Sequence, residues 1–299
     1  SPNSRKIHKK KIPLIGGVLI WFVFGISLFF QNILFNLEIH YIKFYIISSI
    51  FFLVGFFDDK FSLRAIDRLF ILFFLTIIIF KLIEFQEINF LLIDGLGLVH
   101  IYYGSIFLSV FCLLLFQNAM NMIDGLNGLS GGIIVGILFF IILKNTILSS
   151  SPLFQLLSLI LLFLFFNLKN KIFLGDAGVY FLSSFLGLCI IYLSQNQGDI
   201  SANSIFLIMI LPGVDMLRLF VIRIKNKKNP FKADKNHLHH ILLTTNSPFK
   251  TLLMILSLSF LPVFLYEYFY LNFYYSIIIF FIFYIWLLSK KMSKKSLKN

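Results

Sequence analysis

The chain has 299 residues, of which 59% are hydrophobic and only 13% are charged, and its mean hydropathy is +0.92. Soluble domains are about half apolar and about a quarter charged, so this composition excludes a soluble globular domain and predicts a polytopic membrane protein. The net charge of +13 does not indicate nucleic-acid binding, because the basic residues fall in short loops between apolar segments. Cys112 and Cys189 lie inside apolar runs and indicate neither disulfides nor a metal site.

Ten apolar segments are long enough to cross a bilayer, if neighbouring helices shelter the ends of the shorter ones. They cover residues 13–35, 42–57, 65–83, 102–119, 129–147, 153–168, 177–194, 203–222, 250–268 and 273–289. We therefore expect an all-α integral membrane protein with about ten transmembrane helices, in which residues 1–299 form one domain. The stretch INFLLIDGLGLVHIYYGS, between the third and fourth segments, alternates and contains glycines, which predicts a small hairpin outside the membrane.

Ten spans place both ends of the chain on one side of the membrane. All of the 26 Lys and Arg residues then lie on that side except Lys43, Lys81 and Lys144, so the positive-inside rule makes it cytoplasmic. The glutamates all fall on the other side, whereas most aspartates fall at cytoplasmic ends of the segments. A short carboxylate is easily held rigid, so these aspartates are candidates for metal or proton chemistry.

Two of the cytoplasmic ends carry aspartates in distinctive motifs. Asp58 and Asp59 end the second segment in LVGFFDDKFSL, where adjacent carboxylates repel each other unless a cation intervenes. Mg²⁺ suits such a pair because it binds carboxylates and keeps waters or phosphate oxygens as its other ligands; a solvated helix end beside Lys60 is the alternative. Asp176 lies in the motif FLGDAGVYFL. It is a candidate for the same metal chemistry, and the alternative is that it caps the N-terminus of a helix.

The stretch NAMNMIDGLNGLSGG places Asn118, Asn121 and Asp124 beside long apolar runs. Polar groups are costly in lipid unless they line a cavity or face water, so this stretch is a candidate functional site. Because it provides a third cytoplasmic end that bears an aspartate, we favour one shared site over separate helix caps.

Basic and histidine-bearing loops add positive charge on the same side. The loop 223–249 contains KNPFKADKNHLHHILL, and its His237, His239 and His240 cannot all share one helical face. No cysteine accompanies them, so we favour phosphate binding over a zinc site. Four further cations are either topogenic charges or contacts to an anionic substrate: Lys10, Lys11, Arg64 and Arg68.

One face of the bilayer thus carries acidic residues suited to Mg²⁺, basic residues suited to a diphosphate and polar residues suited to a nucleoside. This combination indicates phosphate transfer to a lipid. The motifs HKKKIPLIGG, GFFDDKFSLRAIDRL, NAMNMIDGLNGL, FLGDAG and PFKADKNHLHHILL occur in this order. In these five motifs, which span essentially the whole chain, the protein resembles the polyprenyl-phosphate N-acetylhexosamine-1-phosphate transferases. The resemblance implies transfer of a sugar-1-phosphate from a UDP-sugar to undecaprenyl phosphate, with release of UMP, at the cytoplasmic face of the bacterial inner membrane.

The resemblance also implies roles for individual residues. Asp176 resembles the principal Mg²⁺ ligand of the family, and Asp58 and Asp59 resemble the pair that handles the acceptor phosphate. The nucleotide-sugar wall corresponds to Asn118, Asn121 and Asp124, and phosphate contacts are expected from Lys10, Lys11, Arg64 and Arg68. The spacing of His237, His239 and His240 matches the N-acetylglucosamine branch. The phospho-N-acetylmuramoyl-pentapeptide translocase is the second candidate, and a membrane transporter is the alternative from another class.

The chain departs from the family pattern at three places. Val179 stands where the family usually has Ser, and Asn127 stands where it usually has Asp. The family usually has one more span before the first basic motif, so eleven spans are expected if such a helix precedes this chain. The implied partners are a UDP-sugar, undecaprenyl phosphate and membrane lipid, and two copies of the chain could form a homodimer. The identity of the N-acetylhexosamine and the glycan pathway stay open.

Overall fold

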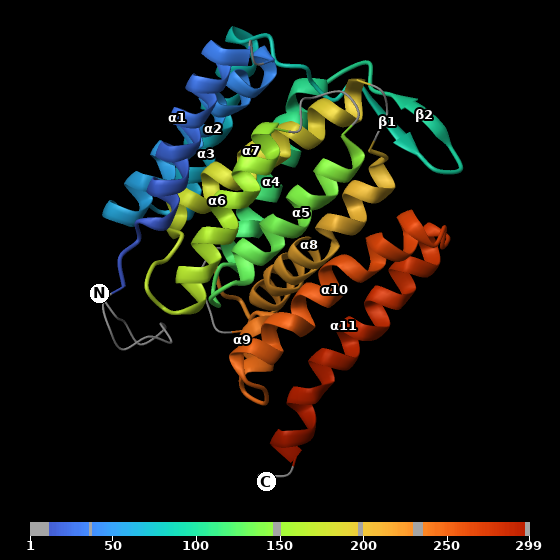
Figure 1. The fold of residues 1–299 in the computed structure, drawn as a ribbon. Helices are drawn as coiled ribbons and strands as arrows, with labels where there is room; N and C mark the ends of the chain where they lie inside the picture. The colour runs from blue at the N-terminus through green and yellow to red at the C-terminus, as the bar shows by residue number, and fades with distance from the viewer. Residues whose placement is uncertain (1–11, 36–37, 146–150, 197–199, 230–235, 297–299) are drawn as a thin grey trace.

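The computed structural model describes residues 12–35, 38–145, 151–196, 200–229 and 236–296, and within them the chain forms eleven helices and one two-stranded sheet (Figure 1). The elements are α1 (Gly16–Phe35), α2 (Ile39–Phe61), α3 (Ala65–Leu82), β1 (Phe90–Ile93), β2 (Gly97–His100), α4 (Ser105–Ile123), α5 (Leu129–Lys144), α6 (Ser151–Leu168), α7 (Gly175–Asn196), α8 (Ala202–Lys225), α9 (Leu238–Leu243), α10 (Pro248–Tyr268) and α11 (Phe273–Ser296). Each of the ten predicted segments coincides with a helix, and α9 is an additional short helix in the loop between α8 and α10.

Within the described part of the chain, seven helices are long and apolar enough to cross a membrane, namely α1, α2, α4, α6, α7, α8 and α10. Helix α5 and the apolar part of α11, Phe273–Ser289, are shorter, and α3 carries the charged residues Asp67, Arg68 and Lys81. Large side chains on the outer faces, such as Phe22, Phe29 and Phe283, are exposed, as expected for lipid-facing surface. The chain is therefore a mostly helical, multi-pass membrane protein, and the number of ten crossings stays a prediction.

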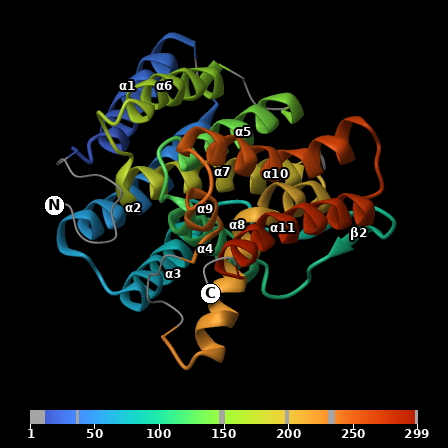
Figure 2. The same cartoon turned by 90° about the horizontal axis from the view of Figure 1, so that it is seen from below.

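Helix α7 is the centre of the bundle, and all of its residues from Ala177 to Gln195 are buried. It packs against α2 along much of its length and also against α1, α4 and α5 (Figure 2). Small residues allow this close approach: a Cβ added to Gly17 of α1 would lie 2.3 Å from the Cα atom of Gly178. A Cβ on Gly55 of α2 would lie 2.7 Å from Ala177. Helices α1 and α2 are thus held against the start of α7.

The predicted hairpin is confirmed, with Phe90 paired to His100 and Ile93 to Gly97. It lies at the end of the bundle opposite α9 (Figure 1). Gln195, near the end of α7, anchors the hairpin: its Oε1 atom accepts the N–H of Asn89 at 2.8 Å, and its Nε2 atom donates to the carbonyl of Phe90 at 2.9 Å.

The helix boundaries differ from the predicted ones mainly at polar ends. Helix α2 continues through Asp58 and Asp59 to Phe61, α4 continues to Ile123, and α7 begins at Gly175. Hydropathy detects only the lipid-compatible part of a helix, whereas backbone hydrogen bonds continue into its polar end. Asp58, Asp59 and Asp176 therefore lie inside helices and not in loops.

Candidate functional site

A cleft of about 1030 Å³ opens where α3, α4, α8 and α9 meet. Its polar wall brings together eight side chains that are far apart in the sequence: Arg68, Asn118, Asn121, Asp124, Arg223, His237, His239 and His240. The rest of the lining is mostly apolar and comes from α3, α4 and α8, with Phe73, Phe111 and Phe220 among its members. A cleft with one polar and one apolar wall suits an amphipathic ligand.

Asp58 is joined to this cleft through Arg68. One carboxylate oxygen of Asp58 accepts the backbone N–H of Leu63 at 2.8 Å, and the other forms an ion pair with the guanidinium group of Arg68. Asp58 is 6% exposed, so the ion pair supplies the countercharge that a buried carboxylate requires. Asp176 lies close enough to Asp59 and Asp58 for the negative charges of these carboxylates to act on its own carboxyl group.

Asp59 serves as the cap of α7. Its two carboxylate oxygens accept the backbone N–H groups of Asp176 and Ala177, each at 3.1 Å. The cap approaches so closely that a Cβ on Gly175, which has φ of 74°, would lie 2.7 Å from the Oδ2 atom of Asp59. The cap interpretation of Asp176 is therefore wrong, because the capping carboxylate comes from α2 and Asp176 lies inside the first turn of α7.

Asp124 follows the last residue of α4 and keeps exposed surface in the cleft. Protein atoms surround its other sides, and this loss of hydration raises the pKa of Asp124 to about 6. A hydrogen bond of 2.6 Å from the hydroxyl of Ser130 opposes the shift, and the negative charge of Asp59 adds to it. Asp59 interacts with both Asp124 and Asp176, and Asp58 interacts with Asp176, so these four carboxylates are here called the acidic cluster.

The acidic cluster fits Mg²⁺ that is shared with a phosphate ligand. Among the described residues, no three His, Cys, Asp or Glu side chains are grouped so that they could hold a metal ion by themselves. Mg²⁺ in phosphate-transfer sites is usually bound by one or two carboxylates, with phosphate oxygens and waters in the other positions. The repulsion between Asp59 and Asp124 is of the kind that a bound cation relieves.

All three histidines line the cleft, although their spacing excludes one common helical face. The reason is that α9 begins after His237, which precedes the helix as its N-cap residue, whereas His239 and His240 lie in its first turn. His239 is 2% exposed, and within the described part of the chain neither of its ring nitrogens has a hydrogen-bond partner. Burial, with His240 and His237 close by, lowers the pKa of His239 to about 3, so its imidazole is neutral at physiological pH.

Gly125 provides the space for His239. A Cβ on Gly125 would lie 2.2 Å from the Nε2 atom of His239, so no larger residue fits there without moving the ring. The glycine after Asp124 therefore brings the α4 wall and the histidine loop into contact.

One of the four predicted phosphate contacts, Arg64, lies away from the cleft. The side chain of Arg64 is 86% exposed, pairs with Asp67 at 2.6 Å, and does not line the cleft. Lys10 and Lys11 lie outside the described residues. Of the two predicted cations that the structure describes, Arg68 lines the cleft and Arg64 does not, and the roles of Lys10 and Lys11 stay predictions.

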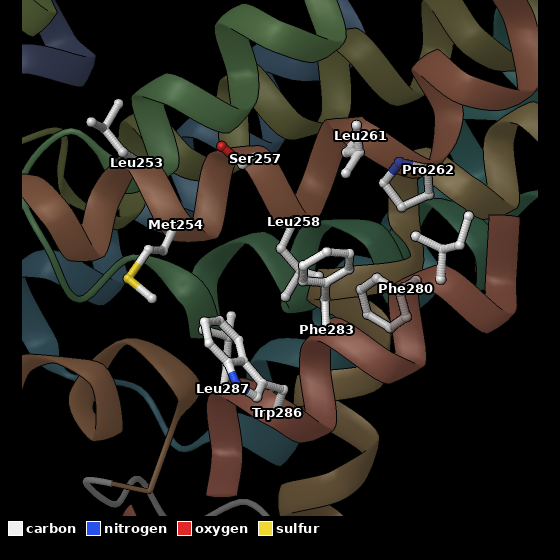
Figure 3. Close-up of a pocket in the computed structure, with 11 residues that line it drawn as sticks. Leu253, Met254, Ser257, Leu258, Leu261, Pro262, Phe280, Phe283, Trp286 and Leu287 are labelled. Atoms are coloured by element: carbon white, nitrogen blue, oxygen red, sulfur yellow. The ribbon is translucent and has the colours of Figure 1, made fainter. Parts of the chain in front are cut away.

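A second hollow, of about 330 Å³, lies between α10 and α11 (Figure 3). Leu258, Phe283 and Trp286 are among its lining residues, and none of the described side chains that line it is ionisable. It offers no group for acid, base or metal chemistry, so the candidate site is the cleft at α9.

The sequence profile of glycosyl transferase family 4 matches residues 41–194, which is just over half of the chain. The chain belongs to glycosyl transferase family 4. The matched region runs from α2 to α7 and contains the whole acidic cluster, whereas the histidine loop follows it.

Relatives with similar sequences carry the name undecaprenyl-phosphate alpha-N-acetylglucosaminyl 1-phosphate transferase. The protein from Thermotoga maritima is 28% identical over 264 residues, covering 86% of this chain and 77% of the relative. The protein from Escherichia coli strain K12 is 27% identical over 271 residues, and that from Salmonella typhi is 26% identical over 263 residues. Each of these two alignments covers 81% of this chain and 68% of the relative.

Two of the three departures from the family pattern are single residues, Asn127 and Val179, and both have structural roles. Asn127 donates from its Nδ2 atom to the carbonyl of Asn167 at 3.0 Å and to the Oδ1 atom of Asn170 at 2.7 Å. It thereby ties the loop after α4 to the end of α6, and an aspartate could donate to neither acceptor. Val179 is fully buried in α7 and does not line the cleft, so this departure affects core packing.

Sequence reasoning missed Asp215 of α8 as a member of the site. Its carboxylate lies 3.0 Å from the Nδ1 atom of His237 and is bound by Arg218 of the same helix and Tyr284 of α11. The available signal was the position of Asp215 at a predicted cytoplasmic end, shared with the acidic cluster.

Proposed function

We propose that this protein transfers an N-acetylhexosamine-1-phosphate group from a UDP-sugar to undecaprenyl phosphate and releases UMP, as the first step of a lipid-linked cell-surface glycan. One observation carries the proposal: a single cleft combines the carboxylate of Asp124, three histidines and an apolar wall in a member of glycosyl transferase family 4. The names of the relatives support undecaprenyl phosphate as the acceptor and N-acetylglucosamine as a candidate sugar.

The apolar wall suits the isoprenoid part of the acceptor. Phe70 of α3 and Phe111 of α4 line the cleft and are 60% and 58% exposed, so this wall is continuous with the lipid-facing surface. A lipid phosphate entering from the bilayer along this wall would reach Arg68, whose guanidinium group supplies positive charge. The acceptor would therefore approach sideways from the membrane.

The polar wall suits the nucleotide sugar. Neutral His239 can donate from one ring nitrogen and accept at the other, and the Nδ2 atom of Asn121 has no hydrogen-bond partner among the described residues. The Nδ2 atom of Asn118 already donates to the carbonyl of Leu114 at 2.8 Å, which leaves its Oδ1 atom as the acceptor for a ligand. These groups would recognise the uracil, ribose or sugar hydroxyls of the donor.

In the proposed reaction an oxygen of the lipid phosphate attacks the β-phosphorus of the UDP-sugar. The bond between this phosphorus and the oxygen shared with the α-phosphate breaks, and UMP leaves with the bonding electrons. Asp176, with Asp58 and Asp59 beside it, would hold Mg²⁺, which neutralises diphosphate charge when bound.

Asp124 is the carboxylate best suited to accept a proton from the lipid phosphate. Its pKa of about 6 is close to the second pKa of a phosphate monoester, which is also about 6. Asp58 is engaged by Arg68 and Asp59 by the start of α7, so both already accept hydrogen bonds from fixed donors.

All ten long helices would cross the inner membrane, with α3 sheltered by its neighbours, and the cleft would face the cytoplasm. The positive-inside distribution of Lys and Arg supports this orientation. At the opposite end of the bundle Lys144 of α5 and Glu267 of α10 form an ion pair of 2.5 Å, as expected for two residues assigned to the outer side.

The test uses purified protein, undecaprenyl phosphate, Mg²⁺ and a panel of radiolabelled UDP-N-acetylhexosamines. We expect a butanol-extractable, lipid-linked product and release of UMP. A product only with UDP-N-acetylmuramoyl-pentapeptide would reassign the protein to the translocase branch, and no lipid-linked product with any donor would overturn the proposal.

The metal assignment is tested with the same assay. Chelation and Asp176→Asn should each abolish UMP release, and added Mg²⁺ should restore activity only after chelation. Glu267→Gln, at the opposite end of the bundle, is the matched control that should keep activity. Substantial turnover by Asp176→Asn, or in the presence of chelator, would contradict the assignment.

A further inference from the structure

Asp215 is a buried carboxylate that the proposed reaction does not use, and it binds four groups from three parts of the chain. It is 3% exposed. It accepts hydrogen bonds from the hydroxyl of Tyr284 at 3.0 Å, from Arg218 at 2.7 Å and from the backbone N–H of Leu238 at 3.3 Å. The Nδ1 atom of His237 lies 3.0 Å from its Oδ2 atom.

This arrangement determines which ring nitrogen of His237 carries a proton. An ionised carboxylate is only an acceptor, so the Nδ1 atom must be the donor in its contact with Asp215. His237 lines the cleft and is 7% exposed. With Nδ1 engaged by Asp215, Nε2 is the ring nitrogen that a ligand in the cleft can reach.

Surrounding contacts keep the carboxylate charged and in place. Arg218 supplies the positive charge, and its guanidinium group also donates to the carbonyl of Asn236 at 2.6 Å and to the hydroxyl of Tyr284 at 2.8 Å. The ring of His239 stacks beside that of His237, with centroids 5.5 Å apart. Asp215, Arg218 and Tyr284 thus form one hydrogen-bond network on α8 and α11. This network holds the carbonyl of Asn236, the ring of His237 and the first backbone N–H of α9.

We propose that Asp215 is a positioning residue that holds His237 as the Nδ1-protonated tautomer, so that His237 contacts the nucleotide sugar through its Nε2 atom. The inference rests on the proposed function for the identity of the ligand. According to this inference, side chains on α8 and α11 orient a binding residue in the cleft. Both helices lie outside the region that the family profile matches.

The sharpest test compares two amide substitutions of His237. In His237→Asn the amide lies near the place of Nδ1, and in His237→Gln it reaches the place of Nε2. If the Nε2 atom contacts the ligand, His237→Gln should retain about tenfold more kcat/KM than His237→Asn. If His237 served only to contact Asp215, an amide near the place of Nδ1 would be sufficient, and His237→Asn would be at least as active as His237→Gln. Equal activity of the two variants, or a more active His237→Asn, would therefore overturn the inference.

A second test changes the partner. The Asn amide in Asp215→Asn can donate to Nδ1, which favours the opposite tautomer, so kcat/KM should fall by about tenfold or more. Adding Asp215→Asn to His237→Asn should then cost little more, whereas independent additive losses would overturn the coupling. Glu267→Gln, which also removes the charge of an ion-paired carboxylate, should stay within about twofold of the wild type.

Ring nitrogen resonances of protein labelled with ¹⁵N-histidine provide a readout that does not need activity. The His237 signals, assigned by their loss in His237→Gln, should report a protonated Nδ1 in the wild type and change in Asp215→Asn. An Nε2-protonated neutral ring in the wild type would overturn the positioning role, even in a protein that forms no lipid-linked product. Absence of product with resonances as expected would instead overturn the proposed function alone.

Discussion

Asp59 of α2 accepts the backbone N–H of Asp176 at 3.1 Å, so one member of the acidic cluster fixes the backbone that carries another. The same carboxylate accepts the N–H of Ala177. The two aspartate motifs, 117 residues apart, therefore form a single structural unit, and substitutions in each should be distinguishable by their effects on stability.

Removing the cap and removing the proposed metal ligand should have different consequences. Asp59→Ala leaves two N–H groups of α7 without their acceptor, so it should lower stability by about 1 kcal/mol and abolish activity. Asp176→Asn keeps the cap and relieves repulsion within the cluster, so it should abolish activity without lowering the melting temperature. Thermal unfolding in detergent measures the stability of the two variants, and UMP release measures their activity. An equal loss of stability in Asp59→Ala and Asp176→Asn would contradict the capping role.

Gly175→Ala should impair the site through its backbone. The residue has φ of 74°, which costs a non-glycine residue about 1–2 kcal/mol, and the new Cβ would meet Asp59 at 2.7 Å. Gly95→Ala in the hairpin is the matched control, because its φ of 86° imposes similar strain while no described atom lies within 4 Å of the added Cβ. Both variants should lose stability through the strained φ, but Gly175→Ala should lose more because it also displaces the capping carboxylate, and only Gly175→Ala should lose UMP release. Retained turnover would contradict the predicted displacement of Asp59.

The raised pKa of Asp124 predicts two dependences on pH. Since it lies above the ordinary value of 3.8, the protonated carboxyl stabilises the fold; this contribution is complete below pH 3.8 and is lost as pH rises through about 6. Asp124→Asn should therefore melt above the wild type at pH 7.5, and the melting temperatures of the two proteins should converge in acid. Turnover of the wild type should fall as pH drops below about 6, where Asp124 becomes protonated. A constant difference in melting temperature from pH 4 to 8 would count against the assignment.

Gly125→Ala should disturb recognition of the donor without unfolding the protein. Its Cβ would overlap the Nε2 atom of His239, so the ring must leave its place against α4 and the KM for the UDP-sugar should rise by about tenfold. Gly213→Ala in α8, where no described atom lies within 4 Å of the added Cβ, is the control and should leave KM unchanged. Steady-state kinetics with varied donor concentration would show the difference, and an unchanged KM in Gly125→Ala would exclude His239 from donor binding.

Much of the architecture could be predicted from the sequence because long apolar runs in a membrane protein have few alternatives to helices. The hairpin followed from alternation and glycines, and the convergence of Asp58, Asp124 and Asp176 on one end of the bundle followed from the alternation of spans. The resemblance to known transferases was carried by motifs and was confirmed by the match to glycosyl transferase family 4.

The remaining features depend on contacts between distant segments. The cap formed by Asp59 requires the packing of α2 on α7, and the role of Asp215 requires α8, α11 and the histidine loop to meet. The convergence of the three histidines depends on where α9 begins, and a helix of six residues leaves no hydrophobic period that would reveal its start. Such features become visible only when the tertiary structure is known.

The burial of α7 has a consequence for how the protein is made. Chains enter the membrane from the N-terminal end, so α1 to α6 reach the bilayer before a helix that has almost no surface for lipid. Until α7 arrives, Gly17 and Gly55 face no partner helix, and Asp59 has no backbone N–H groups of α7 to bind. The acidic cluster, to which we assign the proposed reaction, is thus complete only when α7 has been inserted, which couples the assembly of the candidate site to the completion of the bundle.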